Sequence, residues 1–245
     1  MEGRLIMEER AISGDSDRTK GILYGIGVGS GDPEDITLKA IRVIQNCDVL
    51  MVPTEVKEES MAYKIAVSSC PKICDKEVVA VTFPMTRDRV KREAAIEDAY
   101  GRIRNTLLKG KSVGFLTIGD VTIYSSFAYL RKFAEDDKIP VEMINGIPSF
   151  IAASAALSLD LCKDRNNLHI INGGTDVEEA LRLSGTKVFL KSGKNLEKLR
   201  ETLIRYPDLS VYSVKNCGFQ NQEICVGAEQ IPDGYMVVVI VKTKE

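Results

Sequence analysis

The feature that most constrains this chain is an alternation between short apolar, β-branched runs and segments with the period of a helix. Strand-like runs lie at residues 22–28, 48–52, 78–81, 112–116 and 141–144, and helix-like segments lie at residues 36–45, 61–68, 90–108, after Asp120 and 149–158. Strands that alternate with helices predict an α/β fold with a largely parallel sheet. A chain of 245 residues can bury one large core or two smaller ones.

The pattern changes after residue 161. Residues 162–167 form a polar, turn-forming cluster that predicts a linker. Beyond it we expect strands at 168–172 and 187–190, helices at 176–183 and 196–206, and then three strands at 210–215, 223–226 and 236–241. The sequence therefore predicts a flexible extension over residues 1–20, an N-terminal α/β domain over 21–161 and a C-terminal α/β domain with a mixed sheet over 162–245.

Charge and composition exclude several classes of partner. Lys and Arg number 33 and Asp and Glu number 35, so the net charge of -2 gives no uniform basic field that would attract nucleic acid or anionic lipid. No apolar stretch reaches the roughly 20 residues that span a bilayer, and residues 1–9 lack the basic and apolar regions of a signal peptide. We expect a cytoplasmic protein with neither nucleic-acid nor membrane partners.

The cysteines and the single histidine do not predict a metal site. The one close cysteine pair, Cys70 and Cys74, has neither zinc-ribbon nor thioredoxin spacing, so free thiols and no bound metal are expected. His169 lies inside an apolar strand, which favours a structural role over a catalytic one.

A glycine-rich turn, Gly25-Ile-Gly-Val-Gly-Ser-Gly-Asp-Pro33, follows the first strand. Glycines at alternate positions let the backbone approach a ligand or another segment closely, and Asp32-Pro33 can start a helix. The spacing is not that of a dinucleotide-binding turn, because the third glycine would fall on Ser30 or Asp32, and no Gly-Lys-Ser/Thr ending forms a phosphate loop. The segment alone fits either a ligand loop or a tight turn capped by Asp32.

Three blocks of sequence, in this order, resemble the tetrapyrrole methylases. Gly27-Val-Gly-Ser-Gly-Asp-Pro-Glu34 resembles the opening Gly-x-Gly-Pro-Gly-Asp-Pro-Glu of that family, with Ser30 in place of a proline. Gly119-Asp-Val-Thr-Ile-Tyr124 resembles its Gly-Asp-Pro-x-x-Tyr block, with Val121 in place of a proline. Ile144-Asn-Gly-Ile-Pro-Ser149, which runs into an alanine-rich helix, resembles the third block.

Two further segments, Phe83-Pro-Met85 and Tyr124-Ser-Ser-Phe-Ala-Tyr-Leu130, are similar to the branch of the family that methylates carbon 20 of precorrin-2 or cobalt-factor II in cobalamin biosynthesis. The alternatives within the family are a methylase of uroporphyrinogen or another precorrin and a diphthamide-pathway methylase. A non-catalytic, nucleotide-binding regulatory module is the alternative outside it.

The resemblance implies S-adenosylmethionine as cofactor, an active site in the cleft between two α/β domains, an anionic tetrapyrrole substrate and a homodimer. The motif blocks fall at the carboxyl ends of predicted strands, where open α/β sheets bind ligands. The residues that the resemblance assigns to the cofactor are Ser30, Gly119, Asp120, Ile123, Pro148, Ser149, Leu190, Gly227 and Ala228.

Methyl transfer to a ring carbon requires alignment of donor and acceptor, and loss of a proton from that carbon. Asp120 and Tyr124 are one helical turn apart if a helix begins near Asp120, so both are candidate catalytic residues. Asp120 is equally suited to cap that helix, and Tyr124 to pack against the core.

The many carboxylates of a tetrapyrrole require Arg and Lys partners. The densest basic run contains Arg87, Arg89, Lys91 and Arg92, although such a run is often only a solvated helix face. Lys191, at the end of a strand in the second domain, and Asp32 are further candidate substrate-binding residues.

Overall fold

The first five predicted strands form one parallel sheet. The computed structural model describes residues 20–84 and 88–243, so the predicted extension lies almost wholly outside the described residues. The sheet has the order β3-β2-β4-β1-β5 and contains β1 (Leu23–Gly27), β2 (Val49–Val52), β3 (Glu77–Ala80), β4 (Val113–Thr117) and β5 (Val141–Ile144). The α/β class expected from the alternation is confirmed.

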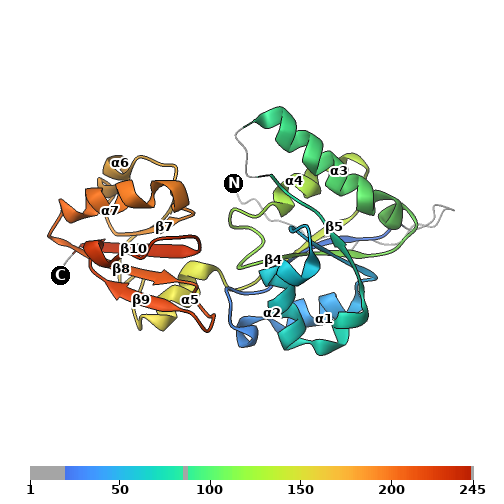
Figure 1. Ribbon diagram of the computed structural model, residues 1–245, viewed down its shortest axis with the longest axis horizontal. Coiled ribbons are helices and arrows are strands. Elements are labelled where there is room, and N and C mark those ends of the chain that lie inside the picture. Colours follow the sequence, from blue (N-terminus) through green and yellow to red (C-terminus); the bar gives the residue numbers. More distant parts are fainter. Residues whose placement is uncertain (1–19, 85–87, 244–245) are drawn as a thin grey trace, which may run out of the picture.

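Two pairs of helices cover the two faces of this sheet (Figure 1). The helices α1 (Leu38–Asn46) and α2 (Met61–Ser69) pack over one face, where Ile44 and Ile65 are buried with Leu50. The helices α3 (Arg89–Leu108) and α4 (Phe127–Asp136) pack over the other, where Ile103 and Phe127 are buried. Burial on both faces explains why the central strands β2 and β4 are continuous apolar runs rather than alternating ones.

The remaining strands form a second, mixed sheet with the order β6-β7-β10-β8-β9. Its strands are β6 (Leu168–Asn172), β7 (Thr186–Leu190), β8 (Leu209–Lys215), β9 (Glu223–Val226) and β10 (Val237–Thr243), and only the pairing of β6 with β7 is parallel. The helices α6 (Val177–Leu181) and α7 (Leu196–Ile204) pack against one face.

The other face of the second sheet is covered by α5 (Ser149–Ala156), whose Phe150 and Ala153 are buried against Val188 and Val214. This helix precedes residue 161, the predicted end of the first domain, yet it packs on the second sheet. The chain therefore passes from the first sheet to the second between β5 and α5.

One predicted helix begins later than expected. Residues 120–126 are turns and bends, and α4 begins at Phe127, where the Ser125 hydroxyl accepts a hydrogen bond of 3.2 Å from the Phe127 N–H. The predicted helix after Asp120 is therefore present, but it does not begin near Asp120, because the Asp120 carboxylate holds Thr122 in a turn instead of capping a helix. Asp120 and Tyr124 are therefore not one helical turn apart.

No helix within residues 20–84 and 88–243 has the length and apolar character needed to cross a membrane. The same described residues contain no group of three or more His, Cys, Asp or Glu side chains that could hold a metal ion. All six cysteines are free thiols.

Candidate active site between the strand-end loops

The loops that follow β1, β4 and β5 meet backbone to backbone. The Gly119 N–H donates to the Gly29 carbonyl at 2.6 Å, and the Gly29 N–H donates to the Gly119 carbonyl at 3.3 Å. A Cβ atom on Gly27 would lie 2.5 Å from the Gly119 oxygen and 2.7 Å from the Gly146 nitrogen, closer than real atoms approach. Gly27 and Gly146 are therefore required for contact between the loops, whereas Gly119 is required for its left-handed φ of 73°.

Asp120 joins two of these loops through a buried carboxylate that is 5% exposed. One oxygen accepts hydrogen bonds from the Thr122 N–H at 2.8 Å and from the Thr122 hydroxyl, and the other accepts from the Gly146 N–H at 3.0 Å and the Asn145 amide at 3.2 Å. Burial alone would raise the pKa of Asp120, but these donors together lower it below its ordinary value. An ionised carboxylate whose lone pairs are all engaged is a brace for the loops and a weak base.

A hydrogen bond connects this region to the second sheet. The ammonium of Lys191, which directly follows β7, donates to the carbonyl oxygen of Tyr124 at 2.7 Å. Partial burial lowers the pKa of this ammonium. Tyr124 and Lys191 both have left-handed backbones, with φ of 49° and 55°, although neither is glycine. Side chains make that conformation unfavourable, and such strain is concentrated at functional sites.

A second contact joins the glycine loop to the turn after β8. A Cβ atom on Gly31 would lie 2.3 Å from the Cys217 carbonyl oxygen, and one on Gly218 would lie 2.4 Å from the Asp32 nitrogen. Cys217 and Gly218 are site residues that the motif blocks did not predict. A strand followed by Asn216-Cys-Gly218 was the available indication, because glycine after a strand often marks a close approach of backbone.

Two buried serine hydroxyls at this junction are weakly satisfied. Ser192, next to Lys191, is 2% exposed, and its Oγ atom has no hydrogen-bond partner within the described part of the chain. Ser30 is 1% exposed, and its Oγ atom meets the thiol of Cys217, which is a weak partner. A buried hydroxyl without a partner is unfavourable, so a polar ligand would complete these groups. The partly buried Ile123 packs in the same cluster as the buried Leu190 and supplies an apolar wall.

The arrangement fits S-adenosylmethionine, which has polar ribose and amino-acid groups and an apolar thioether region. An added Cβ on Gly119 would lie 3.8 Å from the Ser149 nitrogen, so this glycine faces the start of the next motif block without a clash. Pro148 and Ser149 form the start of α5 beside it. The structure therefore brings the predicted Ser30, Gly119, Asp120, Ile123, Pro148, Ser149 and Leu190 to one junction between the two sheets.

Gly227 and Ala228 do not join this group. Glu223, at the start of β9, pairs with Lys215, whereas Val226, at its end, pairs with Tyr212. Gly227 therefore follows the end of β9 that lies away from the Cys217 turn, and its N–H donates to Val211. Ala228 packs against the core beneath α6 and α7. The resemblance of two adjacent residues did not account for the antiparallel direction of β9.

The predicted basic run is only partly described. Arg87 lies outside the described residues. Arg89 forms an ion pair of 2.7 Å with Glu93, and the Lys91 ammonium is 4.0 Å from Asp88. Asp32 accepts a hydrogen bond of 2.8 Å from the Glu34 N–H, which makes it the cap of a short 3-10 helix over Pro33–Asp35. The His169 ring bonds the Ser184 carbonyl at 2.8 Å.

A parallel α/β sheet joined to a mixed sheet, with glycine loops at the junction, defines a two-sheet α/β protein with a ligand site at its strand ends. The sequence profile of the tetrapyrrole (corrin/porphyrin) methylases matches residues 22–231, and the chain belongs to this family.

Individual relatives indicate which members of the family this chain is similar to in sequence. The chain is 32% identical over 206 residues to a protein of Methanocaldococcus jannaschii named probable cobalt-precorrin-2 C(20)-methyltransferase, an alignment that covers 84% of this chain and 86% of the relative. It is 28% identical over 175 residues to the cobalt-precorrin-2 C(20)-methyltransferase of Salmonella typhimurium, covering 70% and 73%. Both alignments span most of each protein.

Solved structures share the fold. Uroporphyrin-III C-methyltransferase from Thermus thermophilus, complexed with S-adenosyl homocysteine, superposes with a TM-score of 0.69 at 18% identity, covering 91% of this chain and 97% of that one. A cobalt precorrin-4 methyltransferase superposes with a TM-score of 0.68 at 16% identity, covering 90% and 94%. At these identities the likeness concerns the fold alone.

Proposed function

We propose that this protein transfers a methyl group from S-adenosylmethionine to carbon 20 of precorrin-2 or its cobalt complex, a step in cobalamin biosynthesis. The observation that carries the proposal is the alignment of most of the chain with relatives named for this reaction. The reaction forms a bond between the methyl group and carbon 20, breaks the bond between that methyl group and sulfur, and releases the proton of carbon 20.

The bound cofactor supplies an electrophilic methyl group whose departure leaves a neutral thioether, so the protein's own task is alignment. The buried hydroxyls of Ser30 and Ser192 and the backbone around Gly119 and Ser149 are the groups available to hold the cofactor. Ile123 and Leu190 exclude water on one side. The turn at Cys217 touches the glycine loop. In this proposal the turn, rather than Gly227 and Ala228, supplies the contact of the second sheet with the cofactor.

The roles of Asp120 and Tyr124 differ in this proposal. The hydrogen bonds to Asp120 and its lowered pKa support a positioning role rather than that of a base. Tyr124 is 41% exposed and stands beside Lys191, so its ring and hydroxyl are available to the tetrapyrrole. Carboxylates of the substrate would meet the ammonium of Lys191 and the basic residues at the start of α3, including Arg89. Asp32, on the glycine loop, is a further candidate contact for groups of the substrate other than its carboxylates.

We also infer that the active form is a homodimer. The face of the second sheet that carries α5 is covered by that two-turn helix and by a few residues such as Leu159 and Leu161. On α5 and β9, Ile151, Ile224 and Val226 remain exposed. Val226 lies opposite Tyr212 in the β8–β9 pair, and residues opposite each other share a face. A second copy of the chain would cover this apolar surface.

The dimer is tested by light scattering on the purified chain. Val226→Lys should convert dimers to monomers, because it places a charge in the proposed interface. Ile204→Lys, an exposed apolar position on α7 at the other face, is the matched control and should leave the mass unchanged. A monomeric wild-type chain would contradict the inference.

The reaction is tested by incubating the pure protein and labelled S-adenosylmethionine with precorrin-2, cobalt-factor II and uroporphyrinogen III in parallel. Label in the first or second acceptor, located at carbon 20 by NMR, is the expected result. Transfer to uroporphyrinogen alone would favour the alternative within the family. Calorimetry with S-adenosylhomocysteine and with nucleotides distinguishes either methylase from a regulatory nucleotide-binding module, because such a module would bind nucleotides but not S-adenosylhomocysteine.

We propose a cytoplasmic location as well, and the free thiols agree with it.

A further inference from the structure

The structure separates the members of the basic run that sequence alone could not rank. Arg89 and Lys91 each have a carboxylate within ion-pair distance on their own helix or its cap. Arg92 forms no ion pair within residues 20–84 and 88–243, and its guanidinium carbon lies 5.8 Å from the centre of the Tyr129 ring on α4. An aromatic face holds a guanidinium in place without neutralising it.

The charges around Arg92 do not balance. Glu93 lies among these cations, and its hydrogen bond from Arg89 is the main cause of its lowered pKa. Lys132 and Arg92 lower the same pKa further through their charges. Arg89, Arg92 and Lys132 therefore surround one carboxylate that is already bonded to Arg89. The surface between the first turns of α3 and α4 has a surplus of positive charge.

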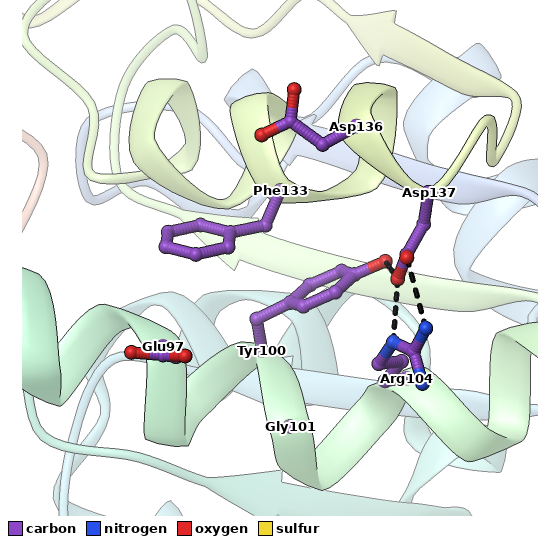
Figure 2. Close-up of a pocket in the computed structure, with 7 residues that line it drawn as sticks. All are labelled: Glu97, Tyr100, Gly101, Arg104, Phe133, Asp136 and Asp137. Carbon is purple, nitrogen blue, oxygen red and sulfur yellow. Dashed lines mark hydrogen bonds and ion pairs between the residues drawn. The ribbon is translucent and has the colours of Figure 1, made fainter.

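The later turns of the same two helices hold a different arrangement of charges. A cavity of about 260 Å³ between the later turns of α3 and α4 is lined by Glu97, Asp136 and Asp137, with the stacked rings of Tyr100 and Phe133 between them (Figure 2). Cations accompany these carboxylates, since Arg104 pairs with Asp137 at 2.6 Å and the Lys20 ammonium bonds the Asp137 carbonyl at 3.0 Å. The surplus positive charge at the Arg92 end attracts an anion to that end.

The Arg92 end is also the end nearest the candidate active site. Tyr129 lies in the first turn of α4, which directly follows the Tyr124 segment that Lys191 contacts. Figure 1 shows α3 beginning on the side of the second sheet. Tyr129 is 46% exposed, so its ring and the guanidinium that it holds are open to a ligand.

We propose that Arg92, held by Tyr129 and supported by Lys132, is a specificity-determining residue that binds peripheral carboxylates of the tetrapyrrole at the rim of the active site. This rests on the proposed function for the identity of the substrate. The guanidinium fork matches a carboxylate with two parallel hydrogen bonds, which a lysine cannot reproduce. Arg92 binds and orients the ring but takes no part in the transfer of the methyl group.

The test compares Arg92→Gln with Arg92→Lys and with a matched control. Arg102→Gln removes a guanidinium from the same helix, where it is paired with Asp98. Loss of a charged hydrogen bond predicts that Arg92→Gln raises the KM for the tetrapyrrole about tenfold, with kcat and the affinity for S-adenosylhomocysteine unchanged. Arg92→Lys should recover part of the loss, and Arg102→Gln should behave as wild type.

A second readout separates this inference from the proposed function. Binding of uroporphyrin, a porphyrin with many carboxylates, is followed by fluorescence in the absence of methyl donor. If the wild-type chain methylates no precorrin but Arg92→Gln weakens uroporphyrin binding, the proposed reaction fails and the carboxylate site stands. An unchanged KM in an active Arg92→Gln enzyme, or a wild-type chain that does not bind uroporphyrin, would overturn the site.

Discussion

At the scale of single residues, the site is shaped by groups whose local conformation is unfavourable unless their surroundings support it. Asp120 is a buried carboxylate that remains ionised because four donors surround it. Tyr124 and Lys191 retain left-handed backbones without being glycine. The composition of these segments does not predict such conformations. Asp120, Tyr124 and Lys191 each contact a loop that is distant in sequence.

Asp120→Asn should weaken the binding of S-adenosylhomocysteine and lower the thermal stability. The amide of Asn has an N–H₂ group in place of one carboxylate oxygen, and this group would face either the donors of Thr122 or those of Asn145 and Gly146. At least one buried donor therefore loses its acceptor, at a cost of about 1–3 kcal/mol. Calorimetry with the product and a thermal melt measure both effects. A stable variant with unchanged affinity and a large loss of single-turnover rate would instead identify Asp120 as the base.

Tyr124→Gly separates backbone strain from chemistry. Glycine adopts a φ of 49° without steric conflict, so the folded state should be unchanged in stability or gain up to about 1 kcal/mol. The methylation rate should fall, because the ring and hydroxyl are lost. Tyr124→Phe provides the control for the hydroxyl. Denaturant unfolding measures the stability, and single-turnover assays measure the methylation rate. A glycine variant that turned over at the normal rate would contradict a role for the Tyr124 side chain.

At the scale of elements, α3 and α4 are joined by a network at their later turns. The Tyr100 hydroxyl donates to Asp137 at 2.8 Å, and the Arg104 guanidinium donates to both oxygens of the same carboxylate (Figure 2). The hydrogen bond from Arg104 is the main cause of the lowered pKa of Asp137, followed by that from Tyr100. The network fixes the end of α4 immediately before β5.

This network predicts a pH dependence of stability. Because the pKa of Asp137 is lower in the folded state than in the unfolded chain, its contribution is complete above the ordinary carboxyl pKa of about 4 and is lost as the pH falls toward the folded value. The difference in unfolding free energy between wild type and Asp137→Asn should therefore shrink between pH 6 and pH 3. Urea titrations at several pH values measure it. A difference that is independent of pH would show that the carboxylate charge contributes nothing.

At the scale of the whole molecule, two sheets with separate cores meet through few contacts, and those contacts form the candidate site. The Gly31 loop touches the Cys217 turn, Lys191 bonds Tyr124, and α5 leaves the first sheet to pack on the second. The division at residue 161 remains a prediction, and the packing of α5 favours a boundary between β5 and α5.

Gly31→Ala tests the dependence of the site on this junction. The new methyl carbon would lie 2.3 Å from the Cys217 carbonyl oxygen, so the two backbones must separate. We expect affinity for S-adenosylhomocysteine to fall while each core remains folded, as judged by circular dichroism. Gly193→Ala is the control, since its Cβ would meet nothing within 4 Å. Equal cofactor affinity in both variants would mean that the contact does not shape the site.

The sequence by itself determined the elements and the family. Strands and helices follow from side-chain periods that are local, and the glycines of three motif blocks stand where backbones touch. Even the Tyr129 and Arg92 positions belong to segments that sequence singled out, but which cation lacks a carboxylate partner depends on packing between α3 and α4.

The tertiary structure alone decided how these elements are combined. Local period cannot reveal that Asp120 braces Gly146 instead of starting a helix, that α5 covers the second sheet, or that the direction of β9 carries Gly227 away from the junction while Cys217 lies against Gly31. Each of these depends on contacts between residues far apart in the chain. Such contacts are set by the burial of whole faces and by strand pairing, which no short stretch of sequence contains.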